Sequence, residues 1–205
     1  MDSIQENKTK WDNRAKTYDK SIRTRFFTSI QSKVIEKIDL SPTMTFLDIG
    51  CGTGWAVKYA YDKAYAQGEF YGIDISEKMI GFAKEKYQDK QAIKFFQCSA
   101  ESINLSSNTI DRIICTNSFH HYSNPITALV DAKRILKSKG VIGIADITAD
   151  SFFSKLLNGL LKMTEKAHMN FYSSRQYEQM FETVELKYSS TKINSMIKIH
   201  IGEKK

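Results

Sequence analysis

The segment LDIGCGTGW, residues 47–55, places three glycines between a run typical of a buried strand and a run with helical spacing. Glycines at such a turn allow tight backbone conformations and let a ligand come close, because no Cβ stands in the way. A glycine-rich strand-to-helix turn is typical of α/β proteins that bind nucleotides. The segment therefore predicts an α/β fold with a nucleotide site at the end of its first strand.

Strand-like and helix-like runs alternate on both sides of this segment. We expect helices over roughly 4–19 and 23–38, then strands in TMTFLDIG, EFYGIDIS, AIKFFQC, IDRIICTNS and VIGIADI, separated by helices that Ser76 and the pair Asn124–Pro125 begin. The helix after Pro125 is expected to end at KSKG. Two more helices, at 151–165 and 173–181, precede the alternating runs VELKYSS and KINSMIKIHI, joined at SSTK. The pattern predicts a doubly wound, mostly parallel, Rossmann-like sheet of seven strands with N-terminal helices and an antiparallel C-terminal hairpin.

The length of 205 residues suits a single domain, and no linker or repeat divides the chain. We expect a helical cap at 1–40, a cofactor-binding core at 41–147, a helical substrate-covering insertion at 148–182 and C-terminal strands at 183–205. The chain shows no signal-peptide pattern, and no apolar run approaches the ~18 residues that span a bilayer. Three cysteines without metal-ligand spacing predict reduced thiols in a cytoplasmic protein, with no metal site.

The net charge of +7 comes from scattered lysines without an arginine-rich stripe. An anionic partner such as nucleic acid or an acidic lipid surface would suit this charge, but the scattered lysines favour a solvated basic surface.

Three kinds of nucleotide loop compete for the glycine segment. A P-loop would need Lys-Ser or Lys-Thr after the glycines, and neither is present. A dinucleotide fingerprint would have glycine or alanine where Trp55 stands. What remains is an acidic-x-Gly-x-Gly-x-Gly pattern, formed by Asp48, Gly50, Gly52 and Gly54. This pattern suits a ligand with a nucleoside end and an amino-acid end.

Polar residues follow the next three strands, at the edge where a doubly wound sheet binds ligands. Asp74 could accept hydrogen bonds from both ribose hydroxyls, or could cap the helix that follows. Ala100 and Glu101 could border an adenine ring, although Glu101 alone could equally be an exposed loop acid. The cluster CTNSFHHYSNP, residues 115–125, stands where a catalytic pocket would open.

Over residues 11–147 the chain resembles the class I S-adenosylmethionine-dependent methyltransferases, and more narrowly the small-molecule group that includes the ubiquinone and menaquinone biosynthesis methyltransferases. The resemblance lies in WDNRAKTYD, LDIGCGTG, GIDIS, CSAESI, IDRIICTNSFHHY and ALVDAKRILKSKGVIGIADI. It implies S-adenosylmethionine as the cofactor and transfer of its methyl group to O, C or N of an acceptor.

The resemblance also implies contacts at the methionine end of the cofactor. Gly50 and its loop neighbours Cys51, Gly52 and Gly54 would contact the methionine part. Asp48 would shape the loop and meet the amino group through water.

At the nucleoside end, the resemblance places Asp74 on the ribose, Ile75 on the adenine face, and Ala100 with Glu101 along the adenine edge. The dipeptide at 98–99 departs from the family pattern, in which an acidic residue commonly precedes the alanine. This departure puts the adenine contacts in doubt.

Further along the cleft, the resemblance implies that Asn117 offers its carbonyl to the methionine ammonium and that Ser118 lines the approach to the methyl group. Tyr18 would close over the cofactor carboxylate, and we group it with the candidate catalytic residues.

His120 and His121 are the candidate general bases, because imidazole titrates near neutral pH. In extended chain they would point in opposite directions, so that one faces the pocket; either could instead be structural. His168 is a weaker candidate from the later insertion.

The acceptor is expected to be small and apolar or aromatic. NPPY and DPPY signatures of amino methylation are absent, so a nucleic-acid substrate is not favoured. An apolar stripe follows the fifth strand: Phe152, Phe153, Leu156, Leu157, Leu160, Leu161 and Met163. Core packing is its default explanation. A lid over an acceptor site, built with Trp11, Tyr18, Phe26 and Phe27, a dimer interface and peripheral membrane contact are the alternatives.

Three other functions stay open at this point. The chain could be a cofactor-binding module without catalysis, or a methyltransferase that acts on RNA or protein. A nicotinamide-dependent dehydrogenase is disfavoured by Trp55.

Overall fold

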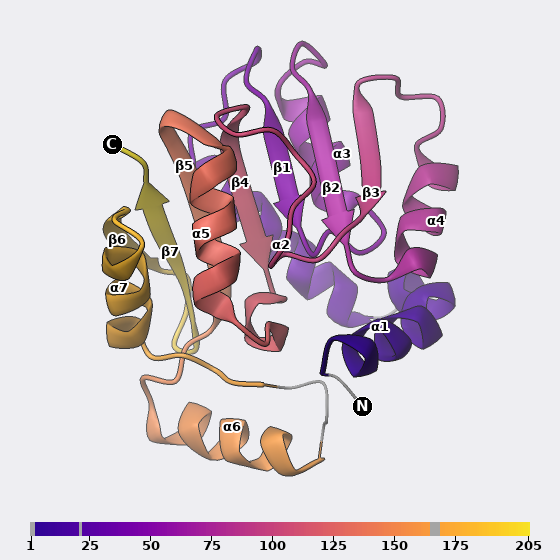
Figure 1. Cartoon of the computed structure of the whole chain (residues 1–205). Helices are drawn as coiled ribbons and strands as arrows, with labels where there is room; N and C mark the ends of the chain where they lie inside the picture. The colour runs from indigo at the N-terminus through magenta and orange to yellow at the C-terminus, as the bar shows by residue number, and fades with distance from the viewer. Residues whose placement is uncertain (1–2, 21, 165–168) are drawn as a thin grey trace.

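The computed structural model describes residues 3–20, 22–164 and 169–205. Its central feature is a seven-stranded sheet in the order β3-β2-β1-β4-β5-β7-β6 (Figure 1). The strands are β1 (Phe46–Ile49), β2 (Phe70–Asp74), β3 (Ile93–Gln97), β4 (Ile110–Thr116), β5 (Leu136–Ile147), β6 (Lys187–Lys192) and β7 (Ile197–Glu203). Strands β1 to β5 pair in parallel, and β7 runs antiparallel to both β5 and β6. The expected doubly wound sheet with an antiparallel C-terminal hairpin is confirmed.

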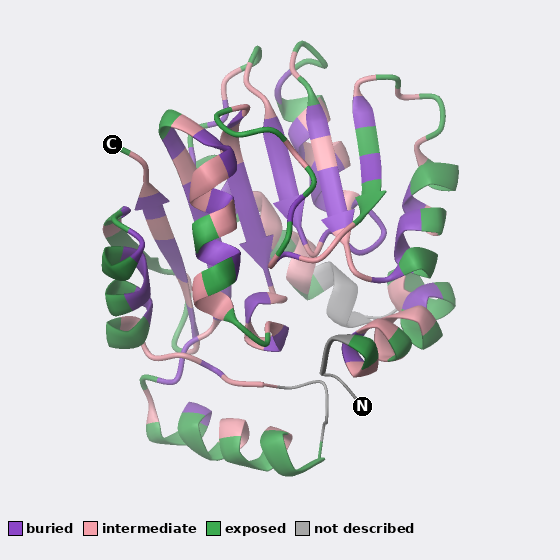
Figure 2. Cartoon of the chain, in the orientation of Figure 1, coloured by how far each residue is buried: buried purple, intermediate pink, exposed green. Residues whose placement is uncertain are grey.

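Helices cover both faces of the sheet. They are α1 (Ser3–Arg14), α2 (Ile22–Lys37), α3 (Trp55–Lys63), α4 (Glu77–Lys86), α5 (Pro125–Ile135), α6 (Phe152–Thr164) and α7 (Ser174–Thr183). Helices α5 and α7 lie in front of the sheet, whereas α2 and α3 lie behind it (Figure 1). Each face has its own apolar cluster, so the central strands β1 and β4 are mostly buried, whereas the edge strands β3 and β6 are largely exposed (Figure 2). No helix in the described ranges is long and apolar enough to cross a membrane.

Helix starts that the sequence predicts have the expected caps. The Ser76 hydroxyl accepts the Met79 N–H at 3.1 Å, and the Asn124 side chain accepts the Thr127 N–H at 3.0 Å with Pro125 in the first turn. Each cap satisfies a backbone donor that the helix itself leaves unpaired. Helix α4 begins just after β2, and α5 begins beyond the 3-10 turn Phe119–His121 that follows β4, so both helix starts border the site.

Three boundaries differ from the expectation. The first expected helix ends at Arg14 and continues as a 3-10 helix over Ala15–Lys20. Strand β5 begins at Leu136, because this buried side chain pairs with Ile110 before the irregularity that KSKG produces. The C-terminal turn lies at 193–196 rather than at SSTK. In this turn the Asn194 side chain accepts hydrogen bonds from two backbone N–H groups.

A buried histidine on β7 predicts a loss of stability in acid. The His200 ring stacks on Tyr177 with ring centres 3.8 Å apart, and its Nδ1 lies 2.9 Å from the Tyr188 hydroxyl. Burial, followed by the Lys198 charge, lowers the pKa of His200 from 6.5 to about 4. The unfolded chain therefore binds more protons between these two values. The stabilisation of the fold by neutral His200 is fully present above pH 6.5 and is lost as the pH falls toward 4.

We expect the free energy of unfolding to fall by roughly 2–3 kcal/mol across this pH window because of His200 alone. Urea unfolding at pH 7.5, 6, 5 and 4 measures the loss. A His200→Phe variant keeps the ring stacking without the titration, and should show a shallower pH dependence. An equal slope in both proteins would show that other groups control acid unfolding.

Candidate active site

The loop after β1 has a backbone conformation that glycine allows. Gly50, Gly52 and Gly54 have φ values of +77°, +53° and +83°. The N–H groups of Gly50 and Cys51 both donate to the Ile73 carbonyl, at 2.8 and 2.9 Å, which ties the loop to β2. The loop therefore presents backbone rather than side chains to the cleft beyond the strand ends.

Two of these glycines also stand where no larger residue fits. A Cβ on Gly50 would lie 2.5 Å from the Ser118 Oγ, and one on Gly54 would lie 2.6 Å from the Phe95 ring. Gly50 thus allows the end of β4 to approach the loop, and Gly54 allows α3 to begin against β3. A Cβ on Gly52 would meet the Tyr18 ring at an ordinary distance of 3.6 Å.

Asp74 connects the glycine loop to the start of α4. Its Oδ2 accepts the Gly52 N–H and its Oδ1 accepts the Ser76 N–H, each at 2.9 Å. Burial raises the pKa of Asp74, while these two N–H donors act in the opposite direction. A carboxylate oxygen can accept more than one hydrogen bond, so Asp74 retains capacity for ligand hydroxyls on the cleft side.

Asp48 lies at the end of β1 and is fully buried. Neither of its carboxylate oxygens has a hydrogen-bond partner among the described residues. Burial, together with the Asp74 charge, raises the pKa of Asp48 to about 8. A buried carboxyl without a donor is costly unless a ligand supplies one or brings positive charge near it.

One cleft joins the glycine loop to the ends of β2, β3 and β4 and to the N-terminal helices. It has a volume of about 1040 Å³, including the space at its open mouth. Eleven of the predicted site residues line it: Tyr18, Gly50, Cys51, Gly52, Asp74, Ile75, Ala100, Glu101, Asn117, Ser118 and His121. The predicted residues Asp48, Gly54 and His120 lie beside the cleft rather than on its wall, and His168 lies outside the described residues.

The N-terminal segment closes one side of the cleft through polar contacts. Asp12 Oδ1 accepts the Ser76 hydroxyl at 2.6 Å and the Lys78 N–H at 3.1 Å, so it caps α4 from outside. The Thr53 hydroxyl donates to Asp19 Oδ1 at 2.5 Å. The Asn7 amide donates to the His121 carbonyl at 2.9 Å. Three elements of the cleft are thereby bonded to the first twenty residues.

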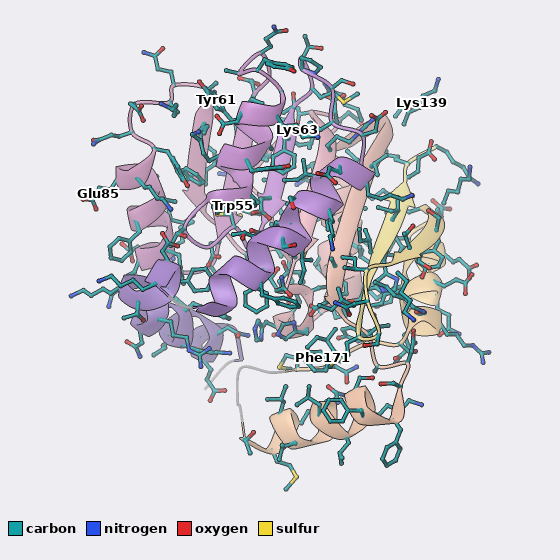
Figure 3. All side chains as sticks on the ribbon, turned by 180° about the vertical axis from the view of Figure 1, so that it is seen from behind. Trp55, Tyr61, Lys63, Glu85, Lys139 and Phe171 are labelled. Atoms are coloured by element: carbon teal, nitrogen blue, oxygen red, sulfur yellow. The ribbon has the colours of Figure 1, made fainter. Side chains whose placement is uncertain are left out.

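Aromatic rings form part of the cleft wall. The Trp11 ring lies edge-on to Tyr18 at 6.2 Å and to His121 at 5.4 Å between ring centres. Trp55 stacks on Tyr59 at 5.1 Å and lines the cleft with Phe27. Figure 3, which views the molecule from behind, shows Trp55 at the first turn of α3, on the viewer's side of the sheet. Burial and the nearby Asp74 and Asp48 raise the pKa of Tyr18 to about 12, so its phenol stays neutral.

The two adjacent histidines do not point in opposite directions, as the extended chain had suggested. They belong to a 3-10 turn, Phe119–His121, that brings their ring centres within 3.9 Å. His121 lines the cleft, whereas His120 Nδ1 lies 2.7 Å from Oδ2 of buried Asp146. Asp146 also accepts the His120 and Ile147 N–H groups, which fixes the carboxylate and the ring beside it.

Ser118 belongs to a polar cluster beneath the glycine loop. Its hydroxyl donates to the Ile49 carbonyl at 3.1 Å and lies 3.1 Å from both the Tyr122 hydroxyl and the Cys115 thiol. Burial raises the pKa of Cys115 to about 12 and that of Tyr122 well above its usual range. The cluster is therefore neutral at physiological pH, and it positions the β4 end rather than supplying a charge.

The remaining predicted residues lie at two turns. Asn117 has a left-handed φ of 53°, and its buried Nδ2 has no hydrogen-bond partner among the described residues. Glu101 Oε1 accepts the Asn124 N–H at 2.9 Å, which ties the β3 end to the start of α5. Ala100 is buried beside it. Glu101 is therefore partly structural, as its alternative interpretation allowed.

Several cleft residues were missed by sequence analysis: Asn7, Thr28, Gln31, Thr53 and Met79. Thr116, Tyr122 and Ser123 also line the cleft, and they belong to the predicted cluster at 115–125. Asp146, the partner of His120, was missed as well. Its position near the end of the fifth strand was the available signal, because Asp48 and Asp74 also lie at the ends of their strands. Nothing in the sequence pairs Asn7 with His121, since the contact joins residues 114 positions apart.

Comparison with known proteins agrees with this geometry. Residues 47–144 match the family described as a methyltransferase domain. The YcgJ methyltransferase of Bacillus subtilis is 30% identical over 146 residues, which are 69% of this chain and 56% of that protein. The demethylmenaquinone methyltransferase of Bacillus licheniformis is 25% identical over 124 residues, 60% of this chain and 53% of that protein. The chain thus spans about half the length of these curated relatives.

The fold agrees as well. The crystal structure of an S-adenosylmethionine-dependent methyltransferase from Aquifex aeolicus has a TM-score of 0.74 at 22% identity, covering 94% of this chain and 97% of that one. Residues 47–144 thus match a methyltransferase domain, and the chain has the same fold as an S-adenosylmethionine-dependent methyltransferase of known structure.

The approach of Ser118 to the loop gives a prediction for Gly50→Ala. The new Cβ would meet the Ser118 Oγ at 2.5 Å in a backbone conformation that alanine disfavours. We expect a loss of about 1–3 kcal/mol in the free energy of unfolding, measured by urea denaturation. Gly81→Ala in α4 is the matched control, because its Cβ would enter open space. This control should be neutral or slightly stabilising; equal stability of the two variants would contradict the argument.

Proposed function

We propose that this chain is an S-adenosylmethionine-dependent methyltransferase that acts on a small apolar or aromatic acceptor. The observation that carries the proposal is the continuity of the cleft: Gly50, Gly52 and Asp74 line it together with Trp11, Phe27 and Trp55. A methyl transfer needs both a cofactor pocket and an acceptor pocket that open on the same point.

The nucleoside end of the cofactor fits the cleft wall between β2 and β3. Asp74 already has its carboxylate fixed by two N–H donors, and its remaining lone pairs suit the two ribose hydroxyls. Ile75 and Ala100 line the adjoining wall and would pack on the adenine faces. Glu101 would lie at the adenine edge.

The methionine end fits the region around Asp48 and Tyr18. The buried, unpartnered Asp48 carboxyl suits a ligand with positive charge, because such a charge would offset its cost of burial. The Asn117 carbonyl would accept a hydrogen bond from the α-ammonium group of the cofactor. The neutral Tyr18 phenol, near Gly52, would cover the loop and donate to the cofactor carboxylate.

The aromatic side chains favour a small acceptor over nucleic acid. Among the described residues that line the cleft, none is lysine or arginine, so the cleft wall itself offers no cation to a phosphate backbone. Two relatives named for a small-molecule acceptor, the demethylmenaquinone methyltransferases of Bacillus licheniformis and Staphylococcus aureus, support the same class. The three free thiols suit the reducing cytoplasm that we propose as its location.

When bound, S-adenosylmethionine supplies a methyl group on a positively charged sulfur, which is already a good leaving group. The chain's own work is then to orient the acceptor against the methyl group and to exclude water. The ring wall of Trp11 and Phe27 would hold the acceptor. For a hydroxyl acceptor, the His121 imidazole on the cleft wall would take the proton as the acceptor oxygen attacks. His120, fixed by Asp146, supports the ring of His121 from behind.

Calorimetric titration with S-adenosylmethionine tests the cofactor site directly. We expect micromolar binding to the wild type, no heat with NADH, and at least a tenfold loss in Asp74→Ala, since a hydrogen bond to a charged group contributes about 1.5–3 kcal/mol. Asp62→Ala is the matched control, because this exposed carboxylate pairs only with Lys58 in the described structure. No binding to the wild type would overturn the proposed function.

The raised pKa of Asp48 predicts that cofactor binding releases a proton. At pH 6.5 the free protein holds Asp48 mostly protonated, because its pKa is about 8. A cationic ligand favours the carboxylate, so binding should release up to one proton, and affinity should rise with pH until Asp48 is ionised in the free protein. Titration in two buffers of different ionisation enthalpy at pH 6.5 counts the protons. The Asp48→Asn variant should release fewer protons when the cofactor binds. Equal proton release by the variant and the wild type would assign the proton to another group.

A further inference from the structure

Helix α6 exposes an apolar face that no other element of the described structure covers. Its exposed large apolar residues are Phe152 (83% exposed), Phe153 (62%), Leu156 (62%), Leu160 (56%) and Met163 (87%). Four of them follow the spacing i, i+4, i+8 and i+11, so they form one face of the helix. Figure 2 shows α6 almost wholly exposed below the strand ends. Core packing, the default explanation of this stripe, is therefore wrong for these five side chains.

The opposite face attaches α6 to the rest of the molecule. Ser154 is buried, and its hydroxyl forms the helix start with Ser151. The Asn158 side chain donates to the Asn170 Oδ1 at 2.9 Å and accepts the Phe171 N–H at 2.7 Å. Figure 3 shows Phe171 between α6 and the sheet. These bonds fix the rotation of α6, so its apolar face points away from the segment to which it is bonded.

The charges of α6 suit an anionic surface. Lys155 and Lys162 lie on the same side of the helix about two turns apart, and both are exposed. Neither pairs with an acidic side chain among the described residues. The helix itself contains no aspartate or glutamate. An apolar face bordered by lysines is typical of helices that lie in the interface of a bilayer with anionic lipids.

Two other occupants suit the observations less well. A stable dimer usually buries about 800 Å² on each partner, more than one face of a short projecting helix provides. A symmetric contact through α6 would also bring the lysines of two copies together. Closure of α6 over the cleft would have to turn the apolar face inward and break both Asn158 hydrogen bonds.

We propose that α6 docks this chain on a lipid bilayer that carries anionic headgroups, with Phe152, Leu156 and Met163 inserted among the acyl chains near the surface. Docking would need no rearrangement, because the apolar face is already exposed. Since α6 lies beyond the ends of the strands, it would turn the cleft side of the molecule toward the membrane (Figure 1). The proposal does not depend on methyl transfer.

Flotation of the full chain with vesicles tests the docking. The vesicles are phosphatidylcholine alone or phosphatidylcholine with about one third phosphatidylglycerol, chosen to supply anionic headgroups. We expect binding to the anionic vesicles, at least a tenfold weaker affinity for Leu156→Ser, and about a fivefold weaker affinity for Lys155→Ala. The binding should also weaken as salt increases.

Val130→Ser is the matched control, because Val130 is an exposed apolar residue on α5, far along the chain from α6. This variant should bind vesicles like the wild type. All variants should keep the wild-type melting temperature and titrate S-adenosylmethionine as the wild type does, so loss of docking is distinguished from failure of the cofactor site.

Three results would overturn the proposal. The first is no binding to anionic vesicles, and the second is equal binding to both kinds of vesicle. The third is unchanged vesicle binding in Leu156→Ser. Self-association without vesicles that Leu156→Ser abolishes, seen by sedimentation velocity, would instead assign the face to a second copy of the chain.

Discussion

The Asp74 carboxylate holds together the two turns on which the cleft depends. It accepts one N–H from the glycine loop and one from the start of α4, each at 2.9 Å. Hydrogen bonds to a charged acceptor contribute about 1.5–3 kcal/mol each, which helps to offset both the burial of the carboxylate and the cost of a loop with three left-handed residues. Ser118 reaches the loop only because Gly50 has no Cβ. The ends of β1, β2 and β4 thereby share one rigid border, and a ligand meets preformed backbone.

The N-terminal segment forms another border of the cleft, and different interactions hold it in place. Helix α1 is mostly polar, and its segment contacts the cleft through the side chains of Asn7, Asp12 and Asp19 and through the Trp11 ring, which lies edge-on to His121. The Asn7 amide is buried, so its hydrogen bond cannot be exchanged for one to water without opening the contact. Side chains therefore hold this border in place, whereas backbone groups hold the glycine loop.

The parts that the sequence predicts well are those with a local cause. The glycine loop, the Ser76 and Asn124 caps and the strand ends depend on neighbouring residues, and all lie where the pattern places them. The parts it predicts poorly depend on distant partners. The turn at Asn194 and the pairing of His120 with Asp146 arise only when the sheet assembles. The apolar stripe of α6 shows the same limit, because periodicity identifies an amphipathic helix without indicating what covers it.

The distribution of charge links the cofactor site to the stability of the fold. The chain carries a net charge of +7, yet four aspartates, Asp12, Asp19, Asp48 and Asp74, gather around the glycine loop. Burial and then the Asp74 charge raise the pKa of Asp48 to about 8, and burial with the charges of Asp74, Asp48 and Asp19 raises that of Tyr18 to about 12. Apolar side chains in place of these carboxylates would avoid this cost, so the carboxylates lower the stability of the ligand-free protein. A cationic ligand reverses the sign of the interaction, because each carboxylate that opposed its neighbours then attracts the ligand. The charge that makes the cleft costly to fold is therefore the same charge that selects a positively charged cofactor over a neutral or anionic nucleotide.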